Sequence, residues 1–307
     1  MRISTNSIFD GSSARLSDLQ SKMDTTSQQI ASGRKILTPS DDPVASARAL
    51  QVQQSVAINT QYGNNRLHVQ NTLGVVDGAL SSIVETLQSV HENVVGASNG
   101  ILSDADRKSY ATALQGQYDQ LLALANSTDG AGHYVFAGNN NGTPPFQVQS
   151  ATTVSYTGDT NPHTVQVDTE RQMDVNVVGS ELFPATSGAD IFSALTDAIA
   201  KLNTPNTLAT TDADLKASLD ALGKSFDASL NATANHQSSV GIRLKELDTL
   251  GVLADSRGLQ YAQTLSSLQD LDYNKALSDL SRQQLALQAA QKTFTQTSNL
   301  SLFNYIQ

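Results

Sequence analysis

The segment Gly96-Ala97-Ser98-Asn99-Gly100 has the spacing of a serine nucleophile between two glycines. Hydrolases place that spacing on a sharp turn between a strand and a helix, where the serine hydroxyl is exposed for attack on a carbonyl. Here the preceding residues repeat apolar side chains every three or four positions, which predicts a helix rather than a strand. We therefore interpret Ser98 as part of a fraying helix end.

The stretch from Asp159 to Glu170 imitates the carboxylate spacing of a calcium-binding loop. Such a loop needs glycine at its sixth position for a sharp turn. Thr164 occupies that position, and Pro162 lies inside the stretch. We expect a β-turn followed by the start of a strand.

The other groups capable of acid–base or metal chemistry lack the partners they would need. The five histidines show no metal-ligand spacing, and His91-Glu92 lacks the second histidine of a zinc-protease helix. Asp41 and Asp42 could form a carboxylate pair, but helix capping and turn formation explain both residues. The chain has no cysteine, which excludes disulfides, thiolate metal sites and a cysteine nucleophile. We expect no enzyme activity, no cofactor and no metal.

The composition of the 307 residues disfavours several further classes of protein. Lys and Arg total 19 against 29 Asp and Glu, and the resulting net charge of -10 disfavours nucleic-acid binding, which needs clustered cations. No apolar run approaches the ~18–20 residues of a membrane-spanning helix. The N-terminus lacks the apolar segment of a cleaved signal peptide, so we expect none. Aromatic residues make up only 5%, which suits extended helices that pack along narrow apolar seams.

Apolar side chains spaced by three and four residues predict long helices in both halves of the chain. The first helix has a heptad seam, formed by Leu16, Leu19, Met23, Thr26 and Ile30. Asp42 followed by Pro43 predicts the start of a second helix, because proline at the first position lacks an N–H that would be unpaired anyway. Ser103 with Asp106 resembles a capping box for a third helix. Helical spacing returns after Asp190, which we interpret as an N-cap. A further helix is predicted by the apolar seam formed by Leu215, Leu219, Leu222 and Phe226.

The middle of the chain has a different pattern, rich in Gly, Asn, Thr and Pro from residue 126 to about 188. Short β-like runs there predict strands at 133–136, 153–156, 164–167 and 173–178. The predicted fold is mainly α with a β insertion: long antiparallel helical hairpins or coiled coil, with a small all-β domain at the tip. We divide the chain into a terminal coiled-coil domain (1–44 plus 265–307), a helical rod domain (45–130 plus 189–264) and a β domain (131–188).

The two terminal seams are narrow and diluted by Ala and Gln. The C-terminal seam consists of Leu277, Leu280, Gln284, Leu287, Gln291 and Phe294. A heptad pattern does not determine which helix packs against it. The seams could therefore form an intramolecular core or a contact with other subunits. Similarly, Arg34, Lys35 and Arg48 could pair with Asp270 and Asp272 or remain solvated.

Several segments in this order resemble the flagellin superfamily. They are Ser32-Gly33-Arg34-Lys35-Ile36, Ser40-Asp41-Asp42-Pro43-Val44-Ala45, Leu268-Gln269-Asp270-Leu271-Asp272-Tyr273 and Gln283-Gln284-Leu285-Ala286-Leu287-Gln288-Ala289. Other segments resemble the branch of the superfamily at the hook–filament junction more than they resemble filament flagellin. These are Met1-Arg2-Ile3-Ser4-Thr5, Asp42-Pro43-Val44, Tyr134-Val135-Phe136-Ala137-Gly138, Pro145-Phe146, Tyr156-Thr157-Gly158-Asp159 and Leu300-Ser301-Leu302-Phe303-Asn304-Tyr305.

The resemblance implies a structural subunit of the bacterial flagellum, in a junction ring between hook and filament on which flagellin assembles. The implied partners are the hook-side junction protein, flagellin, copies of the chain itself in a ring, and a cytoplasmic export chaperone that binds the C-terminal region. No nucleic acid and no membrane insertion are implied. The subunit would be secreted to the flagellum without a cleaved signal peptide, with the terminal domain axial and the β domain directed outward.

Two alternatives remain beside the junction role. One is filament flagellin itself. The other is a secreted adhesin or enzyme that uses the β insertion, although no set of nucleophile and base is visible there.

The resemblance assigns the terminal seams to contacts between subunits. The predicted interface residues are Leu16, Leu19, Met23, Ile30, Leu277, Leu280, Leu287, Phe294, Leu302 and Phe303.

Overall fold

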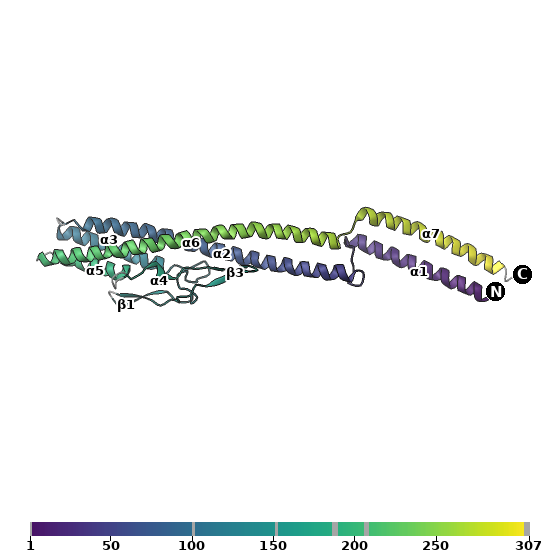
Figure 1. Ribbon diagram of the computed structural model, residues 1–307, viewed down its shortest axis with the longest axis horizontal. Helices are drawn as coiled ribbons and strands as arrows, with labels where there is room; N and C mark the ends of the chain where they lie inside the picture. The colour runs from purple at the N-terminus through teal and green to yellow at the C-terminus, as the bar shows by residue number, and fades with distance from the viewer. Residues whose placement is uncertain (1, 100–101, 151–152, 186–189, 206–208, 304–307) are drawn as a thin grey trace. The chain divides into compact units, whose positions relative to one another are not determined.

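The computed structural model describes the backbone of residues 2–99, 102–150, 153–185, 190–205 and 209–303, and the side chains of residues 7, 9–99, 102–150, 153–185, 190–205 and 213–296. Helices dominate this part of the chain (Figure 1). The elements are α1 (Arg2–Ser32), α2 (Pro43–Ala97), α3 (Asp104–Ala125), β1 (Phe146–Ser150), β2 (Thr153–Tyr156), β3 (Thr164–Asp168), β4 (Arg171–Asp174), α4 (Gly179–Leu182), α5 (Ile191–Asn203), α6 (Ala209–Gln269) and α7 (Tyr273–Phe303).

The chain forms two compact units, which we call the terminal unit and the central unit. The terminal unit comprises Met1–Ile58 and Asp255–Gln307, and the central unit comprises Asn59–Ala254. Helices α2 and α6 each contribute residues to both units. The three-domain division made from the sequence has other boundaries and stays a prediction.

In the terminal unit, α1 and α7 pack against each other with opposite chain directions (Figure 1). Helix α1 ends where Gly33 adopts a φ of 70°, a left-handed conformation that glycine reaches without steric cost. Helix α2 begins ten residues later at Pro43, and Asp42 Oδ1 accepts the N–H of Ala45 at 2.9 Å. The predicted cap and helix start are therefore confirmed.

An apolar core joins the helices and the β insertion of the central unit. Its largest fully buried side chains are Phe136, Phe192, Leu73, Leu80, Ile83, Leu87, Leu114, Leu121, Leu182, Ile191, Leu195 and Leu202. Complete burial of one such side chain contributes about 1.5–3 kcal/mol to folding. The helices around this core begin at two predicted caps: Ser103 and Asp106 form a reciprocal capping box, and Asp190 Oδ1 accepts the N–H of Ser193 at 2.8 Å.

The β insertion contains two separate antiparallel hairpins, β1–β2 and β3–β4. Strands β2 and β3 confirm the predicted runs at 153–156 and 164–167, whereas only the first residues of the predicted 173–178 run belong to β4. The prediction of a strand at 133–136 is wrong: this segment makes one isolated bridge, between Tyr134 and Thr128, and a second bridge follows it, between Ala137 and Val178. Its backbone follows turns because Gly132 and Gly138, on either side, have φ values of 87° and 69°.

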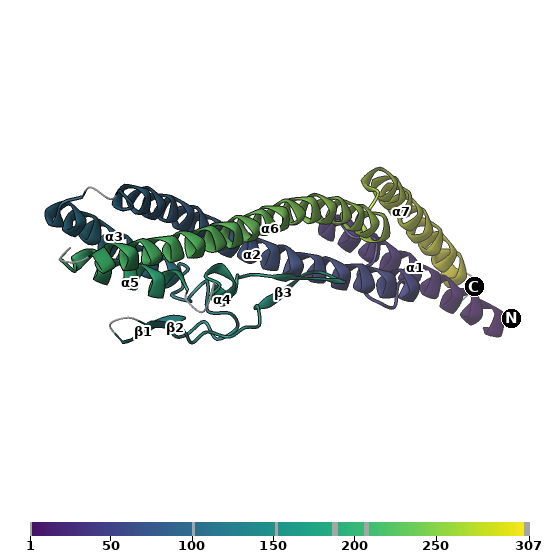
Figure 2. The same cartoon turned by 60° about the vertical axis from the view of Figure 1, so that its left-hand side comes forward.

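The mainly α fold with a β insertion is confirmed, but the insertion lies along the helices rather than beyond their tip. Side chains of Asn65 and Arg66 in α2 donate to carbonyls of β3 at 2.7 and 2.9 Å, and Figure 2 shows β3 beside α2. The reason is that α3 runs back from the end of α2 (Figures 1 and 2). Its 22 residues carry the start of the insertion about 33 Å from that turn.

Candidate assembly interface

The terminal unit brings most of the predicted interface residues onto one pair of helices. The half-buried members are Leu16, Leu19, Met23 and Ile30 on α1 and Leu280, Leu287 and Phe294 on α7. Leu277 lies off this seam and is 51% exposed. Leu302 and Phe303 belong to the last turn of α7, and their side chains lie outside the described residues. Near the ends of the two helices, the rings of Phe9 and Phe294 lie 5.0 Å apart.

Among its described residues, the terminal unit buries no large apolar side chain. Its buried members are Thr26, Ala45, Ala49 and Ala276. Leu285 is 67% exposed and lies nine residues after the buried Ala276, which places it half a turn away on the helix. It therefore faces away from α1. The pair of helices thus has half-buried apolar residues along its seam and further exposed apolar residues that face away from the seam.

The breaks between α1 and α2 and between α6 and α7 are joined by backbone hydrogen bonds. The N–H of Lys35 donates to Gln269 O at 2.7 Å, and the N–H of Leu271 donates to Gly33 O at 3.0 Å. Arg34 and Asp270 face each other in this bridge, but no ion pair between their side chains occurs among the described residues. We call this feature the backbone bridge.

A groove of about 460 Å³ lies next to the backbone bridge. The loop residues Ile36, Leu37 and Pro39 line it on one side, and Ala47 and Leu50 of α2 line it on the other. Asp41 fixes the loop by accepting the N–H groups of residues 37 and 38 at 2.9 and 2.8 Å. These bonds stabilise the ionised carboxylate and lower its pKa. The groove adds a concavity lined by apolar and polar residues to the surface of the terminal unit.

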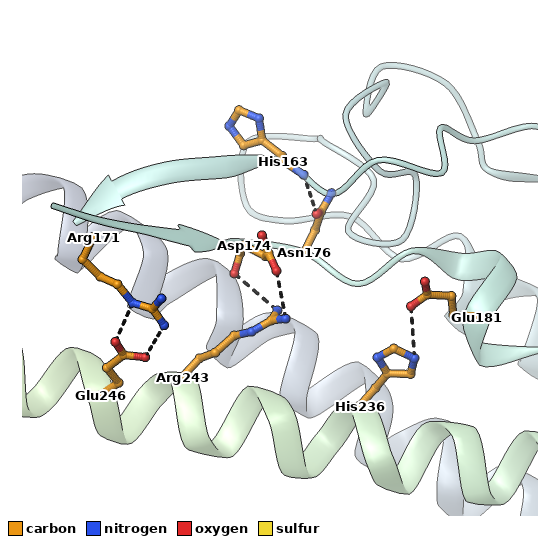
Figure 3. Close-up of polar contacts among 8 residues, drawn as sticks. All are labelled: His163, Arg171, Asp174, Asn176, Glu181, His236, Arg243 and Glu246. Carbon is orange, nitrogen blue, oxygen red and sulfur yellow. Dashed lines mark hydrogen bonds and ion pairs between the residues drawn. The ribbon is translucent and has the colours of Figure 1, made fainter. Parts of the chain in front are cut away.

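In the central unit, one face of α6 holds the β insertion through two ion pairs and a contact between a histidine and a carboxylate (Figure 3). Arg171 Nε and Nη2 donate to the two carboxylate oxygens of Glu246 at 2.6 and 2.8 Å. Arg243 Nη2 lies 3.1 Å from Asp174 Oδ2, and His236 Nε2 lies 3.4 Å from Glu181 Oε2. The α6 residues are spaced by seven and three, which places them on the same helix face.

The ionisation of this face follows from its contacts. Hydrogen bonds from Arg171 lower the pKa of Glu246. Burial lowers the pKa of His236, and the nearby Arg243 charge lowers it further, against the opposing effect of Glu181. At neutral pH the carboxylate of Glu246 is therefore charged and His236 is mainly uncharged.

Helix-derived side chains also pair with backbone groups at the strand edges. Asn126, which follows α3, accepts the N–H of Phe146 at 3.0 Å and donates to its carbonyl at 2.9 Å. Asn65 and Arg66 bind β3 carbonyls, and Arg243 Nη1 lies 3.4 Å from the carbonyl of Asp174. Because unpaired strand edges recruit further strands, these bonds close the strand edges at the residues that they bind.

The structure explains the two enzyme-like motifs without catalysis or metal binding. Ser98 follows the end of α2, and its hydroxyl donates to Val94 O at 2.7 Å. The carboxylate of Asp159 accepts the backbone and side-chain N–H groups of Asn161 at 3.0 and 2.9 Å. Strand β3 then starts at Thr164. The predicted helix end and strand start are confirmed, whereas the segment before the strand is a bend held by the Asp159 side chain rather than the expected β-turn.

The sequence did not reveal that three histidines line one pocket, of about 180 Å³. His68, His133 and His163 come from segments far apart in the chain, so their spacing carried no signal. Asp129 Oδ2 lies 3.4 Å from His133 Nδ1. Burial raises the pKa of Asp129, but backbone N–H groups donated by His133 and Ala131 outweigh this effect and lower it. Within the described residues, no three metal-binding side chains are grouped to hold an ion.

None of the described helices combines the length and the apolar character needed to cross a bilayer.

Comparison with known proteins gives matches over nearly the full length of the chain and matches over parts of it. Residues 3–141 match the family described as bacterial flagellin N-terminal helical region. Flagellar hook-associated protein 3 of Escherichia coli (strain K12) is 36% identical over 318 residues, which cover 99% of this chain and 99% of that protein. Phase 1 flagellin of Salmonella naestved is 29% identical over 138 residues, or 45% of this chain and 27% of the flagellin.

Solved structures show the same fold. A putative flagellar hook-associated protein from Vibrio parahaemolyticus superposes with a TM-score of 0.69 at 24% identity, covering 75% of this chain and 100% of that one. The flagellar junction protein FlgL from Legionella pneumophila superposes with a TM-score of 0.60 at 21% identity, covering 73% of this chain and 100% of that one.

Proposed function

This chain belongs to the family of flagellar hook-associated protein 3 and is a structural protein of the hook–filament junction, where we propose that its copies form a ring on which flagellin assembles. The observation that carries this proposal is that the apolar side chains of the terminal unit are incompletely buried. Its large apolar side chains are half-buried or exposed throughout the described residues. Neighbouring subunits would remove this surface from water, which contributes about 25 cal/mol for each Å² of apolar area.

We infer two layers of contact on the terminal helices. The half-buried seam of α1 and α7 holds the pair together and offers its open margins to neighbours. Leu277 and Leu285, both more than half exposed, add apolar contact outside the seam. The proposed interface thus keeps all ten residues expected from the sequence, with Leu285 and the groove beside the backbone bridge as additions.

Further partners follow from the family and are part of the proposal. The ring would meet the hook-side junction protein on one side and flagellin on the other. A cytoplasmic export chaperone would bind the C-terminal region before secretion without a cleaved signal peptide. The role is structural and not enzymatic, with the terminal domain (1–44 plus 265–307) axial, the rod domain (45–130 plus 189–264) around it and the β domain (131–188) outward.

The test replaces Leu285 by aspartate, because its exposed position allows the monomer to fold while a charge enters the proposed contact. We expect a soluble, helical protein that fails to attach at hook tips, so that the cells make hooks, shed flagellin into the medium and do not swim. Leu287→Asp and Phe294→Asp should have the same effect with some loss of helix. Val95→Asp, at a 60% exposed position of the central unit, is the matched control. Normal swimming of the Leu285→Asp strain would contradict the proposed interface.

Filament flagellin is the alternative that the match to the flagellin N-terminal helical region favours. The two roles differ in the behaviour of the purified protein. A junction subunit should not polymerise extensively by itself, whereas growth of long filaments from purified protein would overturn the junction role. Immunogold labelling of isolated flagella should locate the protein only between hook and filament.

A further inference from the structure

Strand β1 has one residue whose backbone groups face outward without a partner. The N–H of Thr157 donates to Pro145 O at 2.8 Å, which makes these residues a hydrogen-bonded pair. In an antiparallel ladder such pairs alternate, so Gln147 bonds to β2 while the backbone groups of Phe146 and Val148 point away from it. Asn126 binds the groups of Phe146. Within the described residues, nothing binds those of Val148.

The hairpin around this open edge carries no charge. Residues 130–158 contain no Asp, Glu, Lys or Arg, although charged residues make up 16% of the chain. Proteins commonly block exposed strand edges with charged side chains, and here the side chain of Val148 is 56% exposed between two glutamines. A second molecule of this acidic protein can therefore approach β1 without local charge repulsion.

The sequence at the open edge is complementary to itself. Gln147-Val148-Gln149 reads the same in both directions, so antiparallel pairing of two copies places valine opposite valine and each glutamine opposite the other. Val148 and its counterpart would exchange two backbone hydrogen bonds, because both point their N–H and C=O outward. Each pair of glutamine amides can donate and accept across the strands. A register shift between Val148 and Ser150 confines the pairing to this centre.

We propose that β1 pairs with β1 of a second copy of this chain, antiparallel and centred on Val148. Figure 2 shows the β1–β2 hairpin at the margin of the β region, farther from α2 than β3 is. A contact of identical surfaces closes at two copies, so it joins subunits in pairs and does not depend on the ring proposed above. The pairing strands are short, so the contact is weak and concentration-dependent.

Cysteine cross-linking tests both the contact and its register, because the chain has no cysteine of its own. In the proposed register, residue 147 of one copy faces residue 149 of the other as a non-hydrogen-bonded pair, with Cα atoms about 4.5 Å apart. This distance suits a disulfide, whereas two copies of residue 147 lie about 8 Å apart and do not. We expect a mixture of Gln147→Cys and Gln149→Cys proteins to form disulfide dimers at least ~10-fold faster than either protein alone.

Two further variants separate a specific contact from random collision. Val148→Lys, combined with each cysteine variant, places two positive charges face to face and should reduce the cross-linking of the mixture to the rate of the single variants. Val95→Lys, on α2 in the same cysteine backgrounds, should leave it unchanged. Equal rates for the mixture and the single variants would overturn the proposal, as would fast cross-linking that survives Val148→Lys.

Discussion

The terminal and central units have the same spacing of apolar residues, but they bury these side chains to very different extents. Leu80 and Leu87 in the central unit are fully buried, whereas Leu16 and Leu287 in the terminal unit remain partly exposed. The cause is the number of covering elements. In the central unit α3, α5, α6 and the β insertion contribute to one core, while α7 is the element that packs most extensively against α1. A heptad seam thus predicts which face is apolar but not how much of it the chain itself can cover.

The strongest test of this difference replaces the same side chain in each unit. Leu80→Ala should destabilise the central unit by about 2–5 kcal/mol, because it leaves a cavity in a closed core. Leu287→Ala should destabilise the terminal unit by only about 1 kcal/mol, because water already reaches that side chain. Native-state hydrogen exchange measures the two units separately.

A shortened chain provides the control for this pair. Removal of residues 1–32 and 273–307 should leave the thermal midpoint of the central unit unchanged. A large fall in that midpoint, or equal losses from the two alanine substitutions, would show that the terminal helices are part of one common core.

The second test compares two glycines with nearly equal φ angles, Gly33 in the terminal unit and Gly138 in the central unit. Alanine at either position incurs the left-handed strain of about 1–2 kcal/mol. At Gly138 the added Cβ would also meet the backbone of Asp159, whereas at Gly33 it would meet only the hydroxyl end of Tyr273. Urea denaturation should therefore give about 2–4 kcal/mol for Gly138→Ala, and equal costs would contradict the rigidity of the β insertion.

The third test uses pH to address the ion-paired face of α6. The pKa of His236 is lowered in the folded protein by burial, so the unfolded chain binds more protons as the pH falls below the ordinary value of 6.5, and stability declines. The pKa of Glu246 is also lowered, by Arg171, and its stabilisation is lost as the pH falls below the ordinary value of 4.5. The central unit should lose about 1 kcal/mol or less between pH 7 and 5.

The matched variant for the pH series is His236→Gln, which cannot titrate. It should flatten the decline between pH 7 and 5 and leave the later, carboxylate-dependent loss intact. The terminal unit, monitored by exchange in the same samples, lacks histidine and should show no decline in the upper range. An unchanged slope in His236→Gln would exclude this residue as the cause.

The smallest effect is expected at Ser229, whose buried hydroxyl has no hydrogen-bond partner among the residues that the structure describes. Ser229→Ala removes this desolvated polar atom with little change in volume, so the central unit should gain about 0.5 kcal/mol. The midpoint of thermal unfolding measures the gain. Ser21→Ala, at an exposed position of α1, should leave the midpoint unchanged, and a loss of stability in Ser229→Ala would reveal a hidden hydrogen bond.

Helix boundaries and seams could be predicted from the sequence because they depend on neighbouring residues. Asp42, Ser103 and Asp190 each cap a helix that starts one residue later, and local hydrogen bonds suffice for this. The predicted α6 seam is also buried at Leu215, Leu219 and further positions. The resemblance of both chain ends then added the function, which no spacing could have supplied.

The β insertion was predicted less well because distant side chains determine its strands. Strand β1 was missed, and the hydrogen bonds of Asn126 with Phe146 that fix its start join residues twenty positions apart. Asn65 and Arg66 bind β3 across 101 positions. The three histidines of the pocket converge for the same reason. Contacts of this range leave no periodic signal in a single sequence.

The backbone bridge between residues 33–35 and 269–271 fixes the register of α1 and α7 relative to each other. Deleting one residue of α1 between Leu16 and the bridge would rotate the side chains on the N-terminal side of the deletion by 100° relative to α7 and misalign Leu16 with its partners. Deleting seven residues from each helix would return equivalent side chains to the seam. The bridge therefore restricts changes in the length of the terminal helices. To keep the seam aligned, both helices must lose or gain the same number of residues, in units of about two turns.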